Sequence, residues 1–482
     1  MKKTLATLTA ALLLLTGCSS ASQSISTSTP EVQSGPEAET PTEPTRPAED
    51  VTVTIAVIDM TNESLKKEVK RFNDLDCGYQ VELKSYHEHI DKSQSYEDDI
   101  GGETITVYTG EQAFDPVALR VQMDVMSGEV DLVPDYTFEG NLGRFEVLTE
   151  KGAFADLYPF MENDPEVNTD TLDTHVLSLH ETDGELRCLP LYYTIETAVG
   201  DPALVGTKEN WTFDDMLSAW ESAPAGTTFY GISTRDYVYM NLFRGILGDF
   251  VDYDTVSCSF DSPLFLRMLE FCNTFPSPLG YKADPDHTHD LFQSTTIYGV
   301  TNFRSAAEGK TLVGYPTEDG TGAFLNAAYN RWGIVRNTTP EKQAGAWAFL
   351  RTLATEEAQQ VRLPGDDGMQ EDGVFYGENG FPVNKAAAER YAAKLIEKDE
   401  QGIPNPQTAQ GVEYDAGWLP QEEYERCMAY IQGINRLSTN IDSSLQAIVE
   451  EELWRMYADE QTPEKTAENI QSRAEIMVSE RS

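Results

Sequence analysis

The feature of the sequence that most constrains its fold is a change of hydrophobic period that begins at residue 51. Residues 51–58 (VTVTIAVI) alternate in the manner of a buried β-strand. Leu65, Val69 and Phe72 then recur at helical spacing, and residues 79–86 (YQVELKSY) alternate once more. A strand, a helix and a second strand in this order form a unit of a parallel sheet covered by helices. The pattern therefore predicts an α/β fold.

A second copy of the same pattern follows. Leu119, Met123 and Met126 predict the apolar face of a helix that leads into a strand at residues 130–133. Two later helices are predicted from their starts, where a capping threonine precedes a proline at the first helical position and an acid in the first turn, at residues 339–341 and 462–464. At 482 residues the chain is long enough for two domains.

The first 50 residues indicate a targeting segment and a tether. Lys2 and Lys3 precede an apolar run at residues 5–15 that is too short to span a bilayer, as in an export signal. The Leu-Thr-Gly-Cys that ends this segment resembles the lipobox of bacterial lipoproteins, in which residues 1–17 are removed and a diacylated Cys18 becomes the N-terminus. An ordinary secreted protein with a cysteine in its signal is the alternative. Residues 18–50 are rich in Ser, Thr, Pro and Glu, and we expect a disordered tether.

The charge of the chain limits its partners. With 81 acidic against 35 basic residues, the formal net charge is −46. A field of this sign repels nucleic acid and anionic lipid, so we expect no nucleic-acid partner. It also disfavours a strongly anionic ligand, unless arginines cluster locally.

Cysteine and histidine give weak signals. The five cysteines after Cys18 show no framework spacing; a bridge between Cys258 and Cys272 is one interpretation, and buried thiols are the other. His87 with His89, and His287 with His289, would each point two imidazoles to one side of a strand, which suits a metal. Neither pair has further ligands nearby, and solvated loop histidines are the alternative. We predict no cofactor.

Two partial catalytic motifs fail on backbone grounds. Residues 231–233 (GIS) begin like a nucleophile elbow, but Arg235 stands where glycine is needed. Residues 309–311 (GKT) resemble the end of a phosphate loop, but Arg304 stands in place of its first glycine. We therefore predict that the chain is not an enzyme. The alternative is a surface-anchored glycoside hydrolase, because some of the 81 acidic side chains will always pair near a cleft.

Two adjacent tyrosines mark a predicted strand at residues 191–196. On a strand, Leu191, Tyr193 and Ile195 share one face, which is expected to be core. The other face carries an aromatic ring, a hydroxyl and a carboxylate, in Tyr192, Thr194 and Glu196. This second face is either solvent-exposed sheet or the wall of a cleft.

A series of short motifs in fixed order resembles the extracellular solute-binding proteins of bacterial ABC importers, in family 1, which includes sugar-binding proteins. The motifs occupy residues 51–73, 126–132 (MSGEVDL), 184–190 (GELRCLP), 211–215 (WTFDD), 313–317 (VGYPT), 346–350 (AWAFL), 380–383 (GFPV) and 469–473 (NIQSR). The resemblance covers nearly the whole chain after the tether, and the order of the motifs carries it.

The resemblance implies a two-lobed, periplasmic-binding-protein-like fold of type II, in which each lobe is a sheet flanked by helices. Lobe 1 is expected at residues 51–191 plus 326–375, and lobe 2 at residues 192–325 plus 376–482. Hinge crossings let the lobes close around a ligand, and the closed form docks on permease subunits. It implies a monomer, held by its lipid anchor on the outer face of the bacterial cell membrane, that binds a mono- or oligosaccharide.

The resemblance also places candidate ligand-binding residues where family loops meet the cleft. A sugar ring stacks its apolar face on an aromatic side chain, and its hydroxyls need polar partners. Tyr193 is expected to pack behind the cleft. Residues 302–304 replace a segment that often carries a tryptophan in sugar binders. The candidates are Tyr136, Glu139, Tyr192, Thr194, Glu196, Arg235, Asp236, Tyr237, Asn302, Phe303, Tyr329 and Trp332.

Overall fold

The computed structural model describes residues 47, 50–58, 60, 62–100, 103–108, 111–139, 141–229, 233–243, 246–252, 255–279, 290–361, 380–409, 412–415, 417–438 and 443–481. The predicted signal peptide, Cys18, His287 and His289 lie outside these residues. Residues 46–482 form one compact unit. None of the described helices combines the length and the apolar composition that crossing a bilayer requires.

The first of two five-stranded sheets begins with the predicted strand, helix and strand unit. Strand β1 pairs in parallel with β2 and β5, and β15 joins from far along the chain, antiparallel to β5 and β8. In spatial order the strands are β2 (Tyr79–Ser85), β1 (Val51–Val57), β5 (Leu132–Pro134), β15 (Arg331–Ile334) and β8 (Leu189–Pro190). The unit predicted from residues 51–86 is confirmed.

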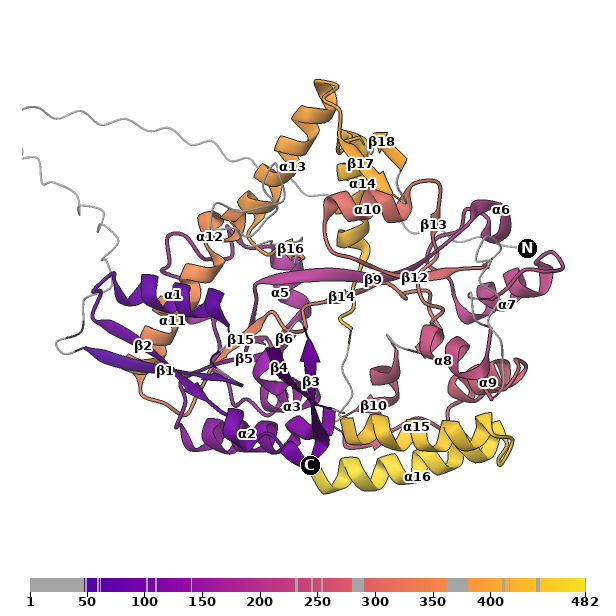
Figure 1. The fold of residues 1–482 in the computed structure, drawn as a ribbon, viewed down its shortest axis with the longest axis horizontal. Helices are drawn as coiled ribbons and strands as arrows, with labels where there is room; N and C mark the ends of the chain where they lie inside the picture. Colours follow the sequence, from indigo (N-terminus) through magenta and orange to yellow (C-terminus); the bar gives the residue numbers. More distant parts are fainter. Residues whose placement is uncertain are drawn as a thin grey trace, which may run out of the picture. The chain divides into compact units, whose positions relative to one another are not determined.

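Alternation along β1 divides the core of this sheet into two layers. Val53 and Ile55 pack with α1 (Glu63–Asn73) and α11 (Pro340–Ala354), where Phe72 meets Phe349 edge to face at 5.5 Å. Ala56 packs on the opposite side, with α2 (Asp115–Ser127) and α3 (Gly143–Glu150). Figure 1 shows these helices around the strands. Both predicted helix starts are confirmed, since α11 and α16 (Pro463–Arg481) each begin at their proline.

The apolar stripe predicted for α2 is wrong in its register. Leu119, Met123 and Met126 are about half exposed, at 50%, 55% and 60%. The buried face instead carries Val117, Ala118, Val121, Val125 and the carboxylate of Asp124. Asp124 can be buried because Tyr86, Lys84 and Arg120 all contact its oxygens within 2.9 Å.

The turn after α2 has the geometry that its sequence predicts. Gly128 ends the helix with φ of 73°, in the left-handed region that favours glycine. A Cβ there would lie 2.3 Å from the carbonyl oxygen of Asn337. The chain can therefore turn sharply from α2 toward β5 only with glycine at this position.

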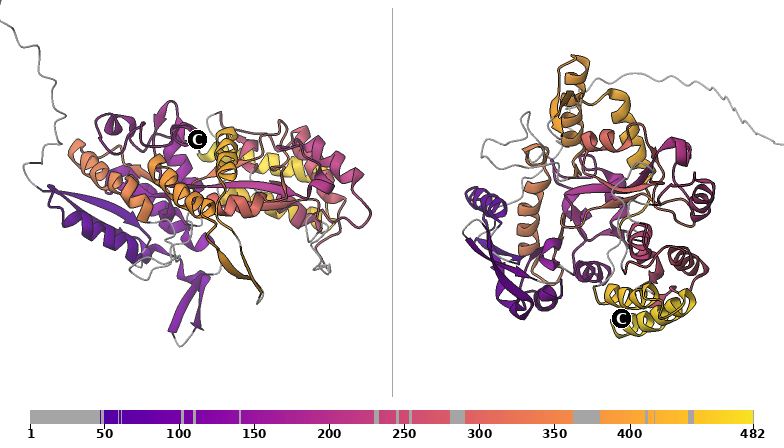
Figure 2. Two further views of the ribbon diagram at one scale, coloured as in Figure 1. Left: turned by 90° about the horizontal axis from the view of Figure 1, so that it is seen from above. Right: turned by 45° about the vertical axis from the view of Figure 1, so that its right-hand side comes forward.

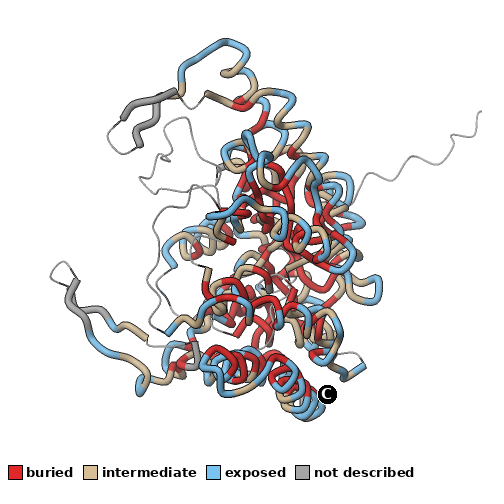
Figure 3. The backbone as a smooth tube through the Cα atoms, turned by 90° about the vertical axis from the view of Figure 1, so that its right-hand side faces the viewer, coloured by how far each residue is buried: buried red, intermediate tan, exposed pale blue. Residues whose placement is uncertain are grey.

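The second sheet is built around the long strand β9 (Tyr192–Gly200). All of its partners are antiparallel and come from later in the chain: β12 (Gln293–Ile297), β13 (Thr311–Leu312), β14 (Phe324–Asn326) and β16 (Phe381–Pro382). Helices α10 (Val300–Ala307) and α14 (Gln421–Gly433) pack on one face, and α7 (Phe213–Ser222), α9 (Pro263–Asn273), α15 (Ser443–Tyr457) and α16 on the other. The yellow helices α15 and α16 lie against α8 and α9 (Figure 2). In Figure 3 the buried segments, drawn in red, lie toward the centre of the molecule, and the exposed segments, drawn in pale blue, lie outside them.

Further helices and strands complete the described part of the chain. Four two-stranded pairs are β3 (Ser95–Ile100) with β4 (Glu103–Tyr108), β6 (Glu181–Thr182) with β7 (Glu185–Leu186), β10 (Val251–Asp252) with β11 (Ser257–Cys258), and β17 (Pro406–Ala409) with β18 (Val412–Asp415). The remaining α-helices are α4 (Tyr158–Met161), α5 (Thr174–Leu179), α6 (Pro202–Val205), α8 (Arg235–Phe243), α12 (Glu356–Val361) and α13 (Lys385–Glu400).

The structure bears on the disulfide and metal-site interpretations of the cysteines and histidines. Cys258 and Cys272 are both free thiols, so the disulfide interpretation is not supported. His87 and His89 lie on a single 3-10 turn, η1 (His87–His89), so the strand geometry considered for this pair does not occur. No three His, Cys, Asp or Glu side chains gather as metal ligands within the described ranges.

Candidate functional site

In the described part of the chain, three segments pass between elements of the first sheet and strands of the second. The first is Leu191, between β8 and β9, and the second is residues 327–330, between β14 and β15. The third runs from α12, which follows α11, to β16, with residues 362–379 outside the described ranges. We call these the crossing segments.

The three crossing segments are tied together at Leu191. Its N–H donates to the carbonyl of Asn330 at 2.9 Å, and its carbonyl accepts from Val383 N–H at 3.1 Å. Gln359 is fully buried and donates its amide N–H to the same carbonyl at 2.7 Å, while its oxygen accepts from Asn384 N–H at 2.8 Å. One backbone position and one glutamine therefore join all three.

Asp135 fixes the second crossing segment from the end of β5. It begins the 3-10 turn η4 (Asp135–Phe138) and is fully buried. One of its oxygens accepts from Arg331 Nε at 2.8 Å and from Tyr329 N–H at 2.9 Å, and the other accepts from Arg331 N–H at 3.2 Å. Burial raises the pKa of Asp135 to about 6, although Arg331 acts to lower it. Arg331 also pairs with Glu146 at 2.7 Å.

Three of the predicted aromatic residues meet at this place. The ring of Tyr136 packs edge to face on Trp332, with centroids 5.9 Å apart, and Trp332 is 5% exposed. Tyr329, whose backbone Asp135 holds, is 51% exposed and has φ of 66°. A tyrosine at positive φ is strained and persists only where its surroundings impose that conformation. The exposed ring is therefore presented at the crossing by a fixed backbone.

The predicted residues on β9 lie beside this cluster, but they are more buried than the sequence suggests. Tyr193 stacks on Phe381 with centroids 5.4 Å apart, as a residue packed behind the site would. Tyr192 is 3% exposed and Glu196 7%, so the solvent-exposed alternative does not hold for either, and the cleft-wall alternative stays a prediction. The reason is that β9 is a central strand with helices on both faces. Thr194 remains half-buried.

Hydrogen bonds connect the β9 residues to the second crossing segment. Asn326 donates to Glu196 at 2.6 Å, and Ser438 donates to its other oxygen at 3.1 Å. Thr194 donates to the carbonyl of Asn326 at 3.3 Å. Tyr192 donates to the carbonyl of Gln359 at 3.4 Å. These side chains can orient a ligand or hold the crossing, and their role in binding stays a prediction.

Arg235, Asp236 and Tyr237 lie on the first turn of α8, in a different environment. Arg235 donates to the carbonyls of Phe275 at 2.9 Å and Met456 at 3.2 Å, and it pairs with Asp459 at 2.5 Å. Its guanidinium therefore joins α8 to the ends of α9 and α15. One oxygen of Asp236 is buried without a hydrogen bond from any described residue, and Tyr237 is half-buried.

The remaining predicted residues do not join the crossing cluster. Asn302 is half-buried on α10, where its side chain accepts from Tyr298 N–H at 3.0 Å. Phe303 is fully buried in the core, with its ring 5.9 Å from that of Tyr430. Glu139 is exposed just after η4.

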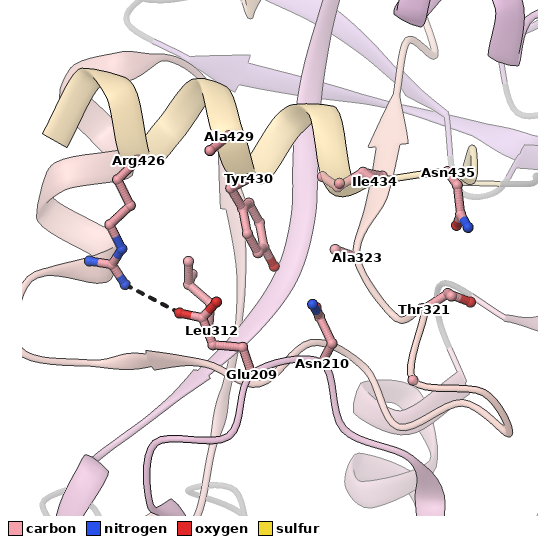
Figure 4. A pocket seen from close by; sticks show the side chains of 12 residues that line it. Glu209, Asn210, Leu312, Thr321, Ala323, Arg426, Ala429, Tyr430, Ile434 and Asn435 are labelled. Carbon is pink, nitrogen blue, oxygen red and sulfur yellow. Dashed lines mark ion pairs between the residues drawn. The ribbon is translucent and has the colours of Figure 1, made fainter. Parts of the chain in front are cut away.

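A cavity of about 320 Å³ lies elsewhere, between α14 and the far end of the second sheet, and none of the twelve predicted residues lines it. Figure 4 shows Tyr430 and Asn210 directed toward one another across it. We call it the α14 cavity. It is lined by Glu209, Asn210, Leu312, Gly320, Thr321, Ala323, Arg426, Ala429, Tyr430, Gly433, Ile434 and Asn435.

Part of the lining of the α14 cavity can be recognised from a pattern in the sequence. Arg426, Ala429, Tyr430 and Gly433 recur at spacings of three and four, so one face of α14 supplies them all. The loop residues opposite them carry no such pattern.

Reactive side chains near the crossing are held in their neutral forms. Burial raises the pKa of the Cys188 thiol to about 12, and burial lowers the pKa of His180 to about 4. A thiol that stays protonated is a poor nucleophile. Tyr329 and the polar groups around it are instead suited to holding a ring and its hydroxyls.

Comparison with known proteins identifies the family. The model of the bacterial extracellular solute-binding protein family matches residues 94–366, more than half of the chain. A periplasmic oligogalacturonide binding protein from Yersinia enterocolitica has a similar structure, with a TM-score of 0.55, 14% identity, and coverage of 89% of this chain and 99% of that one. A de novo designed cysteine esterase also has this fold, with a TM-score of 0.52, 12% identity, and coverage of 90% and 100%.

Curated proteins offer no matching relative. At these identities the two structures speak for the fold alone, and they agree with the α/β architecture of two sheets flanked by helices that the sequence predicts. The family match covers β3 to α12 and includes two of the three crossing segments. The chain belongs to the bacterial extracellular solute-binding proteins.

Proposed function

We propose that this protein is the solute-binding component of an ABC importer, and that it takes a neutral carbohydrate at the crossing segments and delivers it to a permease. The observation that carries the proposal is Tyr329, an aromatic ring 51% exposed at a strained backbone position that Asp135 holds. Such strain is kept where it serves a site.

The proposed lobes are residues 51–191 plus 326–375, and 192–325 plus 376–482. Every strand of the first sheet comes from the first set of residues, and every strand of the second sheet comes from the second set, apart from Asn326 at the end of β14, where the boundary falls. Hinge motion at Leu191 and its partners would open and close the site between them. This division is part of the proposal.

A neutral sugar fits the charge of the protein. The net charge of −46 disfavours an anionic ligand such as the oligogalacturonide that the Yersinia protein is named for. Tyr329 supplies exposed aromatic surface and Tyr136, which packs on the buried Trp332, supplies more beside it, while Thr194 and Asn326 supply hydrogen-bonding groups. We further propose that the chain is a monomer anchored outside the cell through a lipidated Cys18.

Thermal unfolding against a panel of neutral sugars, uronic acids, peptides and metal ions tests the proposal. A ligand that binds only the folded protein stabilises it by about 2.7 kcal/mol at a hundredfold excess over its dissociation constant. We expect one class of neutral sugar to raise the midpoint and to be recovered unchanged. Cleavage of the sugar would indicate a glycoside hydrolase instead, and no shift with any sugar would refute carbohydrate binding.

A pair of variants tests whether the sugar binds at the crossing segments. Tyr329→Ala should weaken binding of that sugar about tenfold, because it removes the stacking surface. Trp454→Ala removes an equally exposed aromatic ring, 52% exposed, from α15 and should leave binding unchanged. Equal losses in both variants would speak against a site at the crossing.

A further inference from the structure

The α14 cavity has the features of a second binding site. All twelve residues that line it come from lobe 2 as proposed, at residues 209–323 and 426–435. Its volume of about 320 Å³ lies at the lower end of the range for small-molecule sites. A ligand could therefore occupy it without any contribution from lobe 1, and only a small one would fit.

A rigid aromatic ring forms one wall of the cavity. Tyr430 is half-buried, and its hydroxyl is hydrogen-bonded to that of Thr197 on β9 at 2.7 Å. Phe303 packs on the same ring at 5.9 Å. With both ends of its side chain fixed, Tyr430 lines the cavity with its ring and directs its hydroxyl end toward Asn210 (Figure 4). A fixed ring of this kind is suited to the apolar face of a flat or chair-shaped ligand.

Several polar side chains around the ring make no hydrogen bonds within the described part of the chain, so they are available to a ligand. In the described part of the chain, no hydrogen bond engages the side-chain amides of Asn210 and Asn435 or the guanidinium of Arg426. Arg426 lies 3.6 Å from Glu209, beyond hydrogen-bond distance, as the dashed line in Figure 4 marks. Two amides, a guanidinium and a carboxylate that line one cavity offer both donors and acceptors to a ligand.

The local charge selects the kind of ligand. Besides Glu209, Arg426 has Glu423 at 3.8 Å, so two carboxylates surround one guanidinium. Phosphate, sulfate or a uronic acid would meet a net negative environment and is disfavoured. A neutral ligand with many hydroxyls can bond to the carboxylate, the guanidinium and the amides at once.

We propose that the α14 cavity is a second carbohydrate site, which takes one neutral pyranose ring stacked on Tyr430 and hydrogen-bonded by Glu209, Arg426 and Asn210. The choice of a sugar rests on the groups that line this cavity. It stands whether or not the crossing segments bind the same class of ligand.

Gly433 allows the cavity to be closed without disturbing the fold. It ends α14, and a Cβ built on it meets nothing within 4 Å. Because Gly433 lines the cavity, we expect Gly433→Trp to narrow or fill it. Gln432→Trp is the matched control, because Gln432 is an exposed neighbour on the same helix and does not line the cavity.

Calorimetric titration of the protein with D-glucose, D-galactose, D-galacturonate and inorganic phosphate tests the proposal. We expect a neutral hexose to bind in an event that Gly433→Trp abolishes, that Asn210→Ala weakens about fivefold, and that Gln432→Trp and Tyr329→Ala leave intact. The Asn210 and Asn435 side-chain amides of 15N-labelled protein should shift during that event.

Two outcomes would overturn the second site. One is that every hexose-binding event survives Gly433→Trp, and the other is that the cavity binds phosphate or galacturonate but no neutral hexose. An event lost only in Tyr329→Ala would belong to the crossing segments. The variants therefore show separately whether the α14 cavity and the crossing segments bind a sugar.

Discussion

Two acid–arginine pairs show how differently this protein uses the same chemistry. Asp135 and Arg331 are 0% and 5% exposed, and the carboxylate receives a guanidinium and two backbone N–H groups. Glu209 and Arg426 are partly exposed, 3.6 Å apart, and share no hydrogen bond. The carboxylate of the first pair is fully engaged by the protein, although Nη2 of Arg331 is buried without a hydrogen bond to any described residue, and the second pair leaves its bonding capacity open.

The difference separates a structural role from a binding role. A buried charge is tolerated only when it is paired and hydrogen-bonded, so Asp135 must hold Arg331 and the second crossing segment in one geometry. An exposed pair adds little to stability and can change partners at little cost. We therefore expect the Asp135 pair to control stability and the Glu209 pair to control ligand binding at the α14 cavity.

The largest expected effect comes from breaking the buried pair. Asp135→Ala leaves Arg331 buried with Glu146 alone and frees the N–H of Tyr329, which should destabilise the fold by about 3–5 kcal/mol. Urea unfolding followed by fluorescence measures the change. Asp135→Asn keeps the shape and one acceptor and should cost less. Equal stability of Asp135→Ala and the parent would contradict a structural role for this pair.

The second largest effect should be a pH dependence of the folding stability, which comes from the buried side chain of His180. Burial lowers the pKa of His180 to about 4, and Arg331 acts in the same direction. The folded protein keeps this imidazole neutral, whereas the unfolded chain binds a proton below about pH 6.5. The contribution of His180 to stability should therefore fall as the pH drops from about 6.5 to 4, by about 3 kcal/mol. The raised pKa of Asp135 acts in the opposite direction, because the folded protein binds that proton at a higher pH than the unfolded chain does.

His180→Phe should remove this part of the acid destabilisation. Unfolding free energies measured at pH 4, 5, 6 and 7 give the slope for both proteins, and His87→Gln, which removes an exposed imidazole, is the control. Identical slopes in His180→Phe and the parent would show that another group carries the acid sensitivity of the interior.

Sequence reasoning succeeded where neighbouring residues determine the structure. The unit of β1, α1 and β2 follows from hydrophobic period alone, and the starts of α11 and α16 follow from their capping threonines and first-turn residues. In α2 the same reasoning failed. The buried face includes Asp124, and a pattern of apolar residues cannot show that Tyr86, Lys84 and Arg120 will neutralise it.

Half of the twelve candidate residues lie together as the sequence predicts, but their exposure was not predictable, and their role in binding stays a prediction. Tyr136, Tyr192, Thr194, Glu196, Tyr329 and Trp332 do gather at the crossing segments. Their burial depends on strands more than 90 residues away, such as β12 and β14, which flank β9. The α14 cavity depends in the same way on loops that meet only in the folded chain.

An intermediate effect is expected at Gln359, which is buried but neutral. Gln359→Ala removes the amide that joins Leu191 to Asn384 and leaves the Asn384 N–H without its partner, at a cost of about 1–3 kcal/mol. Gln360→Ala is the matched control, because that side chain bonds only to the side chains of Glu356 and Arg390 and to neither crossing partner of Gln359. Urea unfolding should rank Gln359→Ala between Asp135→Ala and Gln360→Ala. Any other order would show that the charge of Asp135 is not the reason why Asp135 contributes more to stability than Gln359.

The smallest effect on stability should come from the open pair. Glu209→Gln removes one charge from a partly exposed pair 3.6 Å apart, so the unfolding free energy should change by less than about 0.5 kcal/mol. Binding of a neutral hexose at the α14 cavity should nevertheless weaken about fivefold, because a charged acceptor bonds a hydroxyl more strongly than an amide oxygen does. Calorimetry and urea unfolding on the same preparation measure both quantities. A loss of stability comparable to that of Asp135→Ala, with hexose binding intact, would reverse the two roles.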